Sequence, residues 1–296
     1  MRGVAIVVVL CACDGVFGVR FVPDRDATAG DGSSDAPAPF DRCAPQPLDA
    51  LRYGVGLQST GFDFTLARTR CSYKGMDLAD LDDEAEWAYV MQHVSAWQSN
   101  APEFLGATDN LVENTFVGVD GCPAVLHFSQ NEPNGGAAEN CVELDSAWGD
   151  QDGTCAGNFG GTQLTAAACE TPRWPDATCL AAATRPANLT MLAGPVTFAT
   201  ARTQCAATGG HLLEIDSTAE LTAATALAGN NAFWVDAQWD VTMAAWESGT
   251  GCPELFGWAP GYPLSVPGAT VCAQISATGG AKDVACDTFQ TAICEM

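Results

Sequence analysis

Hydrophobic positions recur with the period of a helix in two separate stretches of this chain. Residues 64–72 and 198–207 each fit an amphipathic helix that carries a cysteine near its end. Gly75 and Gly209 follow these stretches, and glycine often ends a helix because it adopts a left-handed backbone without strain. The pattern therefore predicts one helix in each stretch.

A second helix is expected after each of these two. Asp82 and Asp216 are its predicted N-caps, because an aspartate carboxylate accepts hydrogen bonds from the N–H groups of a first turn. After Asp82, a buried stripe at helical spacing is made by Trp87, Val90, Met91 and Val94.

Helical periodicity then fades into short apolar runs that Gly, Pro, Asn and Asp interrupt. The runs that we expect to be strands are residues 104–107, 116–119, 141–144, 233–236 and 271–275. A short strand is also expected before each first helix. Helices early and strands with long loops later predict an α+β fold.

The two stretches are copies of one sequence. Residues 64–71 match residues 198–205, which lie 134 positions further on, and six cysteines recur in the same order in each copy. A repeat of this length predicts a duplicated domain rather than a solenoid of small units. We call residues 43–170 the first repeat and residues 177–296 the second repeat.

The cysteine count and the charge limit the classes of protein. Of the 14 cysteines, twelve form two matched sets of six, which predicts three disulfides per repeat and an oxidising compartment. Zinc is a poor alternative, because outside the N-terminus no Cys-x-x-Cys and no cluster of Cys and His occurs. The net charge of −24 argues against nucleic acid as a partner.

The N-terminal segment predicts export. Residues 1–13 have a short basic start, a brief apolar run and an end that resembles the lipobox of bacterial lipoproteins, with Cys13 as the lipidated residue. An ordinary signal peptide cut nearby is the alternative. Residues 14–42 are small, polar and rich in Gly and Pro, which is typical of a flexible tether. We therefore expect a cell-envelope lipoprotein, anchored to a membrane by its lipid, or an extracellular protein.

Ordered motifs in both repeats resemble the C-type lectin-like domain family. In the first repeat they are the helix ending in Cys71, Phe104-Leu105-Gly106, Glu132-Pro133-Asn134, residues 140–144 and the closing Cys169-Glu170. The second repeat closes in the same way at residues 292–295. The resemblance implies two tandem α+β domains with long loops and disulfides, in a family that binds carbohydrates or proteins.

The resemblance also implies the disulfide pairs, among which the sequence alone does not choose. The family pattern gives Cys71–Cys169, Cys141–Cys155, Cys205–Cys294 and Cys272–Cys286. With these assigned, the remaining cysteines are left to pair as Cys43–Cys122 and Cys179–Cys252.

The first repeat carries a candidate site for calcium and sugar. Calcium prefers carboxylate and amide oxygens, and Glu132 and Asn134 offer both on either side of Pro133. The resemblance implies that Pro133 is cis, that Glu139 is a further ligand, and that these three polar residues also bind two adjacent hydroxyls of a mannose-type sugar. The alternative is that the tripeptide is only a polar turn.

A fourth calcium ligand is expected shortly before Cys155, where the match to the family weakens. Counting back from this cysteine selects Asp152, whereas counting forward from Trp148 selects Asp150 and puts Gly149 where the family has asparagine. We prefer Asp152, because the distance to the disulfide fixes the loop.

The second repeat lacks the same oxygens. Tyr262 and Leu264 replace the glutamate and the asparagine, and Lys282 puts a positive charge beside the remaining acid, which opposes cation binding. This repeat is expected to be a spacer, a structural partner or a calcium-independent binding surface. Its four tryptophans are expected to be core residues, with one of them exposed for contact: Trp234, Trp239, Trp246 and Trp258.

Enzymatic activity is not expected, because the three histidines are scattered and no nucleophile elbow or phosphate loop occurs. The leading hypothesis is an exported protein whose first repeat binds a glycan or cell-surface glycoconjugate through calcium. The alternative hypothesis is a calcium-independent protein–protein adhesion module of the same fold, and a structural envelope protein without a ligand is the third.

Overall fold

In the computed structural model, residues 40–296 form one compact unit, in which some short segments are not described. The described residues are 41, 43–57, 61, 63–97, 103–145, 149–159, 162–164, 166–173, 178–179, 181, 188–242, 245–264, 270–277 and 279–296. The expected signal peptide with Cys13, nearly all of the expected tether, and Trp148 lie outside these residues. Among the described helices, none has both the length and the hydrophobicity to cross a bilayer.

The first helix of each repeat lies where the sequence predicts it. Helix α1 spans Phe64–Ser72 and helix α4 spans Phe198–Ala207. Gly75 and Gly209 follow them with φ angles of 74° and 89°, a backbone conformation that favours glycine. Local sequence therefore sets both ends of these helices.

The second helix of each repeat begins one residue later than predicted. These helices are α2 (Glu84–Trp97) and α5 (Thr218–Ala228). Their caps are Asp83 and Ser217, whose side-chain oxygens accept hydrogen bonds from backbone N–H groups of the first turn. The predicted caps Asp82 and Asp216 are therefore wrong. Each instead donates its backbone N–H to the carboxylate of a glutamate in the first turn of the helix. The backbone N–H of the same glutamate bonds the side chain of the cap, so the arrangement resembles a capping box.

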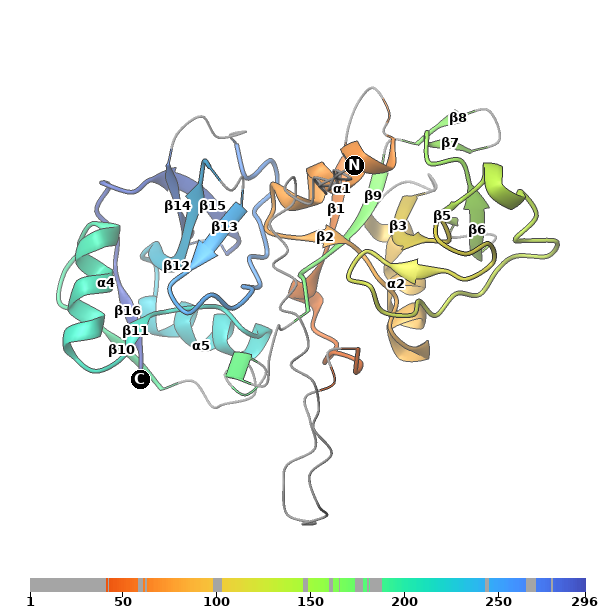
Figure 1. The fold of residues 1–296 in the computed structure, drawn as a ribbon. Helices are drawn as coiled ribbons and strands as arrows, with labels where there is room; N and C mark the ends of the chain where they lie inside the picture. Colours follow the sequence, from red (N-terminus) through yellow and green to blue (C-terminus); the bar gives the residue numbers. More distant parts are fainter. Residues whose placement is uncertain are drawn as a thin grey trace, which may run out of the picture. The chain divides into compact units, whose positions relative to one another are not determined.

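One sheet of seven strands organises the first repeat (Figure 1). Its strands are β1 (Tyr53–Leu57), β2 (Asp77–Leu78), β3 (Glu103–Thr108), β4 (Val117–Gly118), β5 (Cys141–Asp145), β6 (Gly149–Gly153) and β9 (Ala166–Glu170). The order along the main path is β1-β9-β3-β5-β6, with β2 paired to β9 and β4 paired to β3. Because β1 pairs antiparallel with β9, the two ends of the repeat meet in the sheet.

Short elements complete the first repeat. They are the hairpin of β7 (Asn158–Phe159) and β8 (Thr162–Gln163) and the 3₁₀ helices η1 (Ala50–Arg52) and η2 (Gly136–Ala138). The hairpin has no counterpart among the described strands of the second repeat.

Two smaller sheets organise the second repeat. One has the order β10-β16-β11, from strands β10 (Leu189–Met191), β16 (Ile293–Glu295) and β11 (His211–Leu212). The other has the order β13-β12-β14-β15, from strands β13 (Ala245–Ser248), β12 (Phe233–Asp240), β14 (Val271–Ile275) and β15 (Ala281–Ala285). Helices and antiparallel strands in both repeats make the α+β class, as the sequence predicts.

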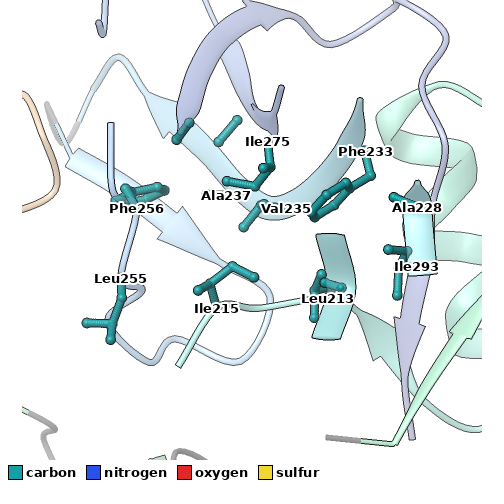
Figure 2. Close-up of a cluster of buried hydrophobic side chains, with 13 residues drawn as sticks. Leu213, Ile215, Ala228, Phe233, Val235, Ala237, Leu255, Phe256, Ile275 and Ile293 are labelled. Atoms are coloured by element: carbon teal, nitrogen blue, oxygen red, sulfur yellow. The ribbon is translucent and has the colours of Figure 1, made fainter. Parts of the chain in front are cut away.

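Each repeat contains its own buried apolar clusters. The cluster drawn in Figure 2 packs α5 against β12, β14 and β16, with Phe233 and Ile275 among its buried members. In the first repeat Val90 is fully buried, and Trp87 and Met91 pack against the same cluster, which agrees with the predicted stripe. The side chain of Val94 lies outside the described residues.

The four tryptophans of the second repeat belong to the interior. Trp234 and Trp239 are buried, and Trp246 and Trp258 are partly buried against the core, so the expectation of one exposed tryptophan is wrong. The indole N–H of Trp258 donates to the carbonyl of Lys74 at 2.7 Å, and that of Trp246 donates to the carbonyl of residue 73 at 3.0 Å. Since both indoles are engaged by the turn after α1, neither is an open platform for a ligand.

Six disulfides cross-link the chain, and the pairs are those that the family resemblance implies. They are Cys43–Cys122, Cys71–Cys169, Cys141–Cys155, Cys179–Cys252, Cys205–Cys294 and Cys272–Cys286. In each repeat the first helix is thereby bonded to the last strand.

Glu103 in β3 makes stability depend on pH. Its side chain is fully buried, neither carboxylate oxygen has a hydrogen-bond partner among the described residues, and burial raises its pKa to about 8. The folded state therefore keeps a proton that the unfolded chain releases at lower pH. The resulting stabilisation is complete below the unfolded pKa and is lost as pH rises through about 8.

We predict that the free energy of unfolding falls less between pH 5 and pH 9 in the Glu103→Gln variant than in the wild type. The slope should decrease by up to about 1.4 kcal/mol per pH unit, the value for one proton. Urea unfolding at a series of pH values measures it, with Glu113→Gln as the control at an exposed glutamate. A Glu103→Gln slope equal to that of the wild type would contradict the assignment.

Candidate functional site

The loop between β4 and β5 carries three of the predicted site residues and contains two local backbone turns. The N–H of Glu132 donates to the carbonyl of Ser129 at 3.0 Å, and the N–H of Glu139 donates to the carbonyl of Gly136 at 2.9 Å. The peptide bond between Glu132 and Pro133 is cis. Glu132, Asn134 and Glu139 therefore belong to one loop, with Glu132 and Glu139 each held in a backbone turn.

Glu139 lies against the backbone beside Asn134. A Cβ atom placed on Gly135 would be 2.0 Å from Oε2 of Glu139, so only glycine leaves room for this carboxylate. Glu132 and Glu139 are partly exposed and Asn134 is exposed. Oε2 of Glu132 is buried, although the residue as a whole is partly exposed.

Glu143 in β5 lies close enough to Glu139 to feel its charge, and the sequence analysis did not assign it to the site. The side chain is 1% exposed, and its pKa is raised to about 7, first by burial and then by the charge of Glu139. The sequence analysis treated residues 141–144 as a strand and residues 140–144 as part of the family resemblance, but not Glu143 as a site residue. An acid flanked by Val142 and Leu144, which are buried apolar residues, was the available signal.

The strand register distinguishes the two candidates for the fourth ligand. The Cα atom of Asp152 lies opposite Val142, whereas that of Asp150 lies opposite Leu144, further along β5 from the loop. At about 3.3 Å per residue, the backbone of Asp152 is about 7 Å nearer to the loop. The side chains of both residues lie outside the described part of the chain.

In the matching loop of the second repeat, side chains of the same repeat occupy the candidate ligand positions. Its Tyr262–Pro263 bond is also cis. Oδ1 of Asp283 accepts a hydrogen bond from the N–H of Leu264 at 2.7 Å, and the ammonium of Lys282 lies 5.2 Å from the centre of the Tyr262 ring. A backbone N–H and an ammonium thus occupy positions where a cation site needs oxygens.

A second acidic group lies in the first repeat, and the sequence analysis missed it as well. Carboxylate oxygens of Asp80, Asp82 and Asp120 lie within 4.8 Å of one another, the one such group of three found among the described residues. Acids at alternate positions of an extended segment share a side, and this was the available signal for Asp80 and Asp82.

Arg173 neutralises part of this group. Its guanidinium forms ion pairs with Asp82 and Asp120. The pKa of Asp80 is raised to about 10, first by burial and also by the neighbouring Asp120. A guanidinium and a proton therefore offset two of the three negative charges.

The chain matches the Lectin C-type domain over residues 62–160 and again over residues 194–296. Since these two matches cover more than half of the sequence, the chain belongs to the C-type lectin domain family.

Three solved structures illustrate what the chain is similar to. The C-type lectin TC14 of the tunicate Polyandrocarpa misakiensis is 21% identical over 38% of this chain and 98% of its own, with a TM-score of 0.33. The carbohydrate-recognition domain of the mouse scavenger receptor C-type lectin is 23% identical over 42% and 94%, with a TM-score of 0.35. The herring type II antifreeze protein is 20% identical over 40% and 89%, with a TM-score of 0.34. No curated protein matches the chain.

We predict that Arg173→Gln lowers the free energy of unfolding at pH 7 by about 3–5 kcal/mol, because the carboxylates lose their guanidinium while they remain buried. The loss should be smaller at pH 5, since the acids of the variant take up protons in the folded state. Urea unfolding at both pH values measures it. Arg68→Gln is the control, because its pair with Asp77 is partly exposed and should contribute at most about 1 kcal/mol. Equal losses at the two pH values would contradict the charge argument.

Proposed function

We propose that this protein is an exported lectin whose first repeat binds a glycan through calcium. The observation that supports this most is the Glu139 carboxylate, which packs on Gly135, the residue after Asn134, in the loop that carries the cis Glu132–Pro133 bond. A polar turn without a ligand needs no carboxylate in that position.

The proposed calcium ligands are Glu132, Asn134, Glu139 and Asp152, which offer the carboxylate and amide oxygens that calcium prefers. Bound calcium would supply coordination positions for two adjacent sugar hydroxyls. The carboxylates of Glu132 and Glu139 would accept hydrogen bonds from those hydroxyls, and the amide of Asn134 would donate one. The order Glu-Pro-Asn supports a mannose-type ligand.

The duplication supports Asp152 as the fourth ligand. In the second repeat Asp283 lies opposite Ala273 in the strand pair, as Asp152 lies opposite Val142 in the first. The carboxylate of Asp283 reaches the loop at Leu264, the counterpart of Asn134. By analogy, Asp152 at the same strand position in the first repeat is proposed to reach the loop that carries Asn134.

The second repeat is proposed to act without calcium. Its loop is closed by the Asp283–Leu264 hydrogen bond and by the cation–π contact of Lys282 with Tyr262, so any partner of this repeat would be bound by other chemistry. This observation favours binding without calcium in the second repeat, which is also what the alternative function, a calcium-independent protein–protein adhesion module, requires.

An exported location is part of the proposal. Six disulfides are typical of proteins in oxidising compartments. The lipobox-like sequence around Cys13 supports a lipid anchor, with residues 14–42 as the tether between membrane and repeats.

We predict that the full chain binds one calcium ion and that Glu132→Gln weakens this binding at least about tenfold, because a carboxylate ligand becomes a neutral amide. Calorimetric titration of the calcium-depleted protein measures the stoichiometry and the affinity. Asp283→Asn in the second repeat is the matched control and should leave both unchanged. A loss caused by Asp283→Asn, or none caused by Glu132→Gln, would contradict the division of roles.

We predict that Asn134→Asp lowers retention on mannose resin more than it lowers calcium affinity. Aspartate keeps an oxygen for the metal but removes the amide donor to the sugar. Affinity chromatography with calcium or with chelator measures retention, and calorimetry measures the metal. Retention that persists in chelator and in this variant would favour the calcium-independent adhesion module.

A further inference from the structure

A hollow of about 310 Å³ opens on the second repeat, outside the cis-proline loop. It is lined by residues 191, 192, 194 and 195 at and after the end of β10, by residues 231–232 before β12, and by residues 289–291 before β16. Its volume is at the lower end of the range for small-ligand pockets, which begins at roughly 300 Å³.

The hollow coincides with a difference in length between the repeats. From Cys155 to Cys169 the first repeat advances 14 positions, whereas from Cys286 to Cys294 the second repeat advances 8. The six additional residues of the first repeat include the β7–β8 hairpin, and the second repeat has only the short segment around Phe289. The lining of the hollow is therefore specific to the second repeat.

The chemistry of the lining favours an uncharged ligand with a flat apolar face. No charged side chain contributes to it. Phe289 is 68% exposed and Met191 is 44% exposed, so an aromatic ring and a thioether are open to solvent at one place. The net charge of −24 would in addition repel an anionic ligand.

Polar groups in the hollow are held in place by the backbone. The N–H and the carbonyl of Gln290 both pair with Val196, at 3.1 Å and 2.8 Å, and the N–H of Thr291 donates to the carbonyl of Ala232 at 3.2 Å. The Nδ2 group of Asn231 donates to a helix carbonyl at 3.0 Å, which leaves the Oδ1 atom of the same amide as an acceptor. Two amides and one hydroxyl are thus presented on a fixed backbone beside an exposed ring.

We propose that this hollow is a calcium-independent binding site for one neutral pyranose ring of a glycan. The C–H face of the sugar would lie on Phe289, and its hydroxyls would bond Asn231, Gln290 and Thr291. An all-equatorial, glucose-type ring fits this best, because its C–H bonds form an uninterrupted apolar face. The inference goes beyond the proposed function, since it concerns the other repeat and needs no metal.

The test is saturation-transfer NMR on the full chain in chelator, with methyl β-glucopyranoside as the probe. A ligand of this size is expected to bind with a Kd of about 1 mM. Phe289→Ala should weaken binding at least about fivefold, because the stacking surface is lost. The matched control is Leu264→Ala, which truncates another exposed side chain of the same repeat, at 71% exposure, and should change nothing.

Additional variants and a second ligand test the interpretation. Gln290→Ala should also weaken binding, and thermal melts of all variants should match the wild type, since only exposed or partly exposed side chains change. Glucuronate should not bind. Unchanged binding in Glu132→Gln keeps this site distinct from the calcium site of the first repeat, so either proposal can fail alone.

Three outcomes would overturn the proposal. They are no saturation transfer to methyl β-glucopyranoside, transfer that Phe289→Ala leaves unchanged, and transfer to N-acetyl-leucine amide without transfer to the sugar. The last outcome would assign the hollow to an apolar peptide side chain.

Discussion

The fold depends on closing each repeat upon itself. In the first repeat the buried disulfide between Cys71 and Cys169 bonds helix α1 to strand β9, while β1 pairs with the same strand. The link spans 98 positions of sequence, and cross-links over such long loops restrict the unfolded chain most. With its ends fixed in this way, the repeat can devote a long stretch of irregular chain to a loop, because the loop does not have to hold the domain together.

The two repeats share this architecture but differ at the loop that carries the cis-proline. Both repeats have a cis peptide bond before proline. In the first repeat Glu132 and Asn134 flank this proline, whereas in the second repeat Asp283 accepts a hydrogen bond from the loop and Lys282 packs against it. In the second repeat the acid of this loop is thus satisfied internally, whereas in the first repeat a carboxylate and an amide side chain flank the proline. The tryptophans of the second repeat are likewise buried or partly buried in its interior.

The acidic composition creates a second constraint. The chain has 36 acidic residues and only 12 lysines and arginines. Several of these scarce cations lie at acids inside the fold, as in the pairs of Arg52 with Glu170, Arg173 with Asp82, and Arg202 with Asp236. Because a buried carboxylate without a partner is costly, acids such as Glu103 hold protons at pH values where exposed acids are charged. The stability of the fold therefore depends on the protonation and pairing of its buried acids.

The sequence by itself determined the elements whose causes are local. Helices α1 and α4 have the predicted bounds, because their periodicity and the glycines that follow them act within a few residues. The caps at Asp83 and Ser217 were missed by one residue, since several neighbouring polar side chains can cap. Only the tertiary structure brought Asp80, Asp82 and Asp120 around Arg173, brought the carboxyl group of Glu143 near Glu139, and formed the hollow at Phe289. These features join residues from distant elements, and their proximity depends on strand order and burial, which no local pattern encodes.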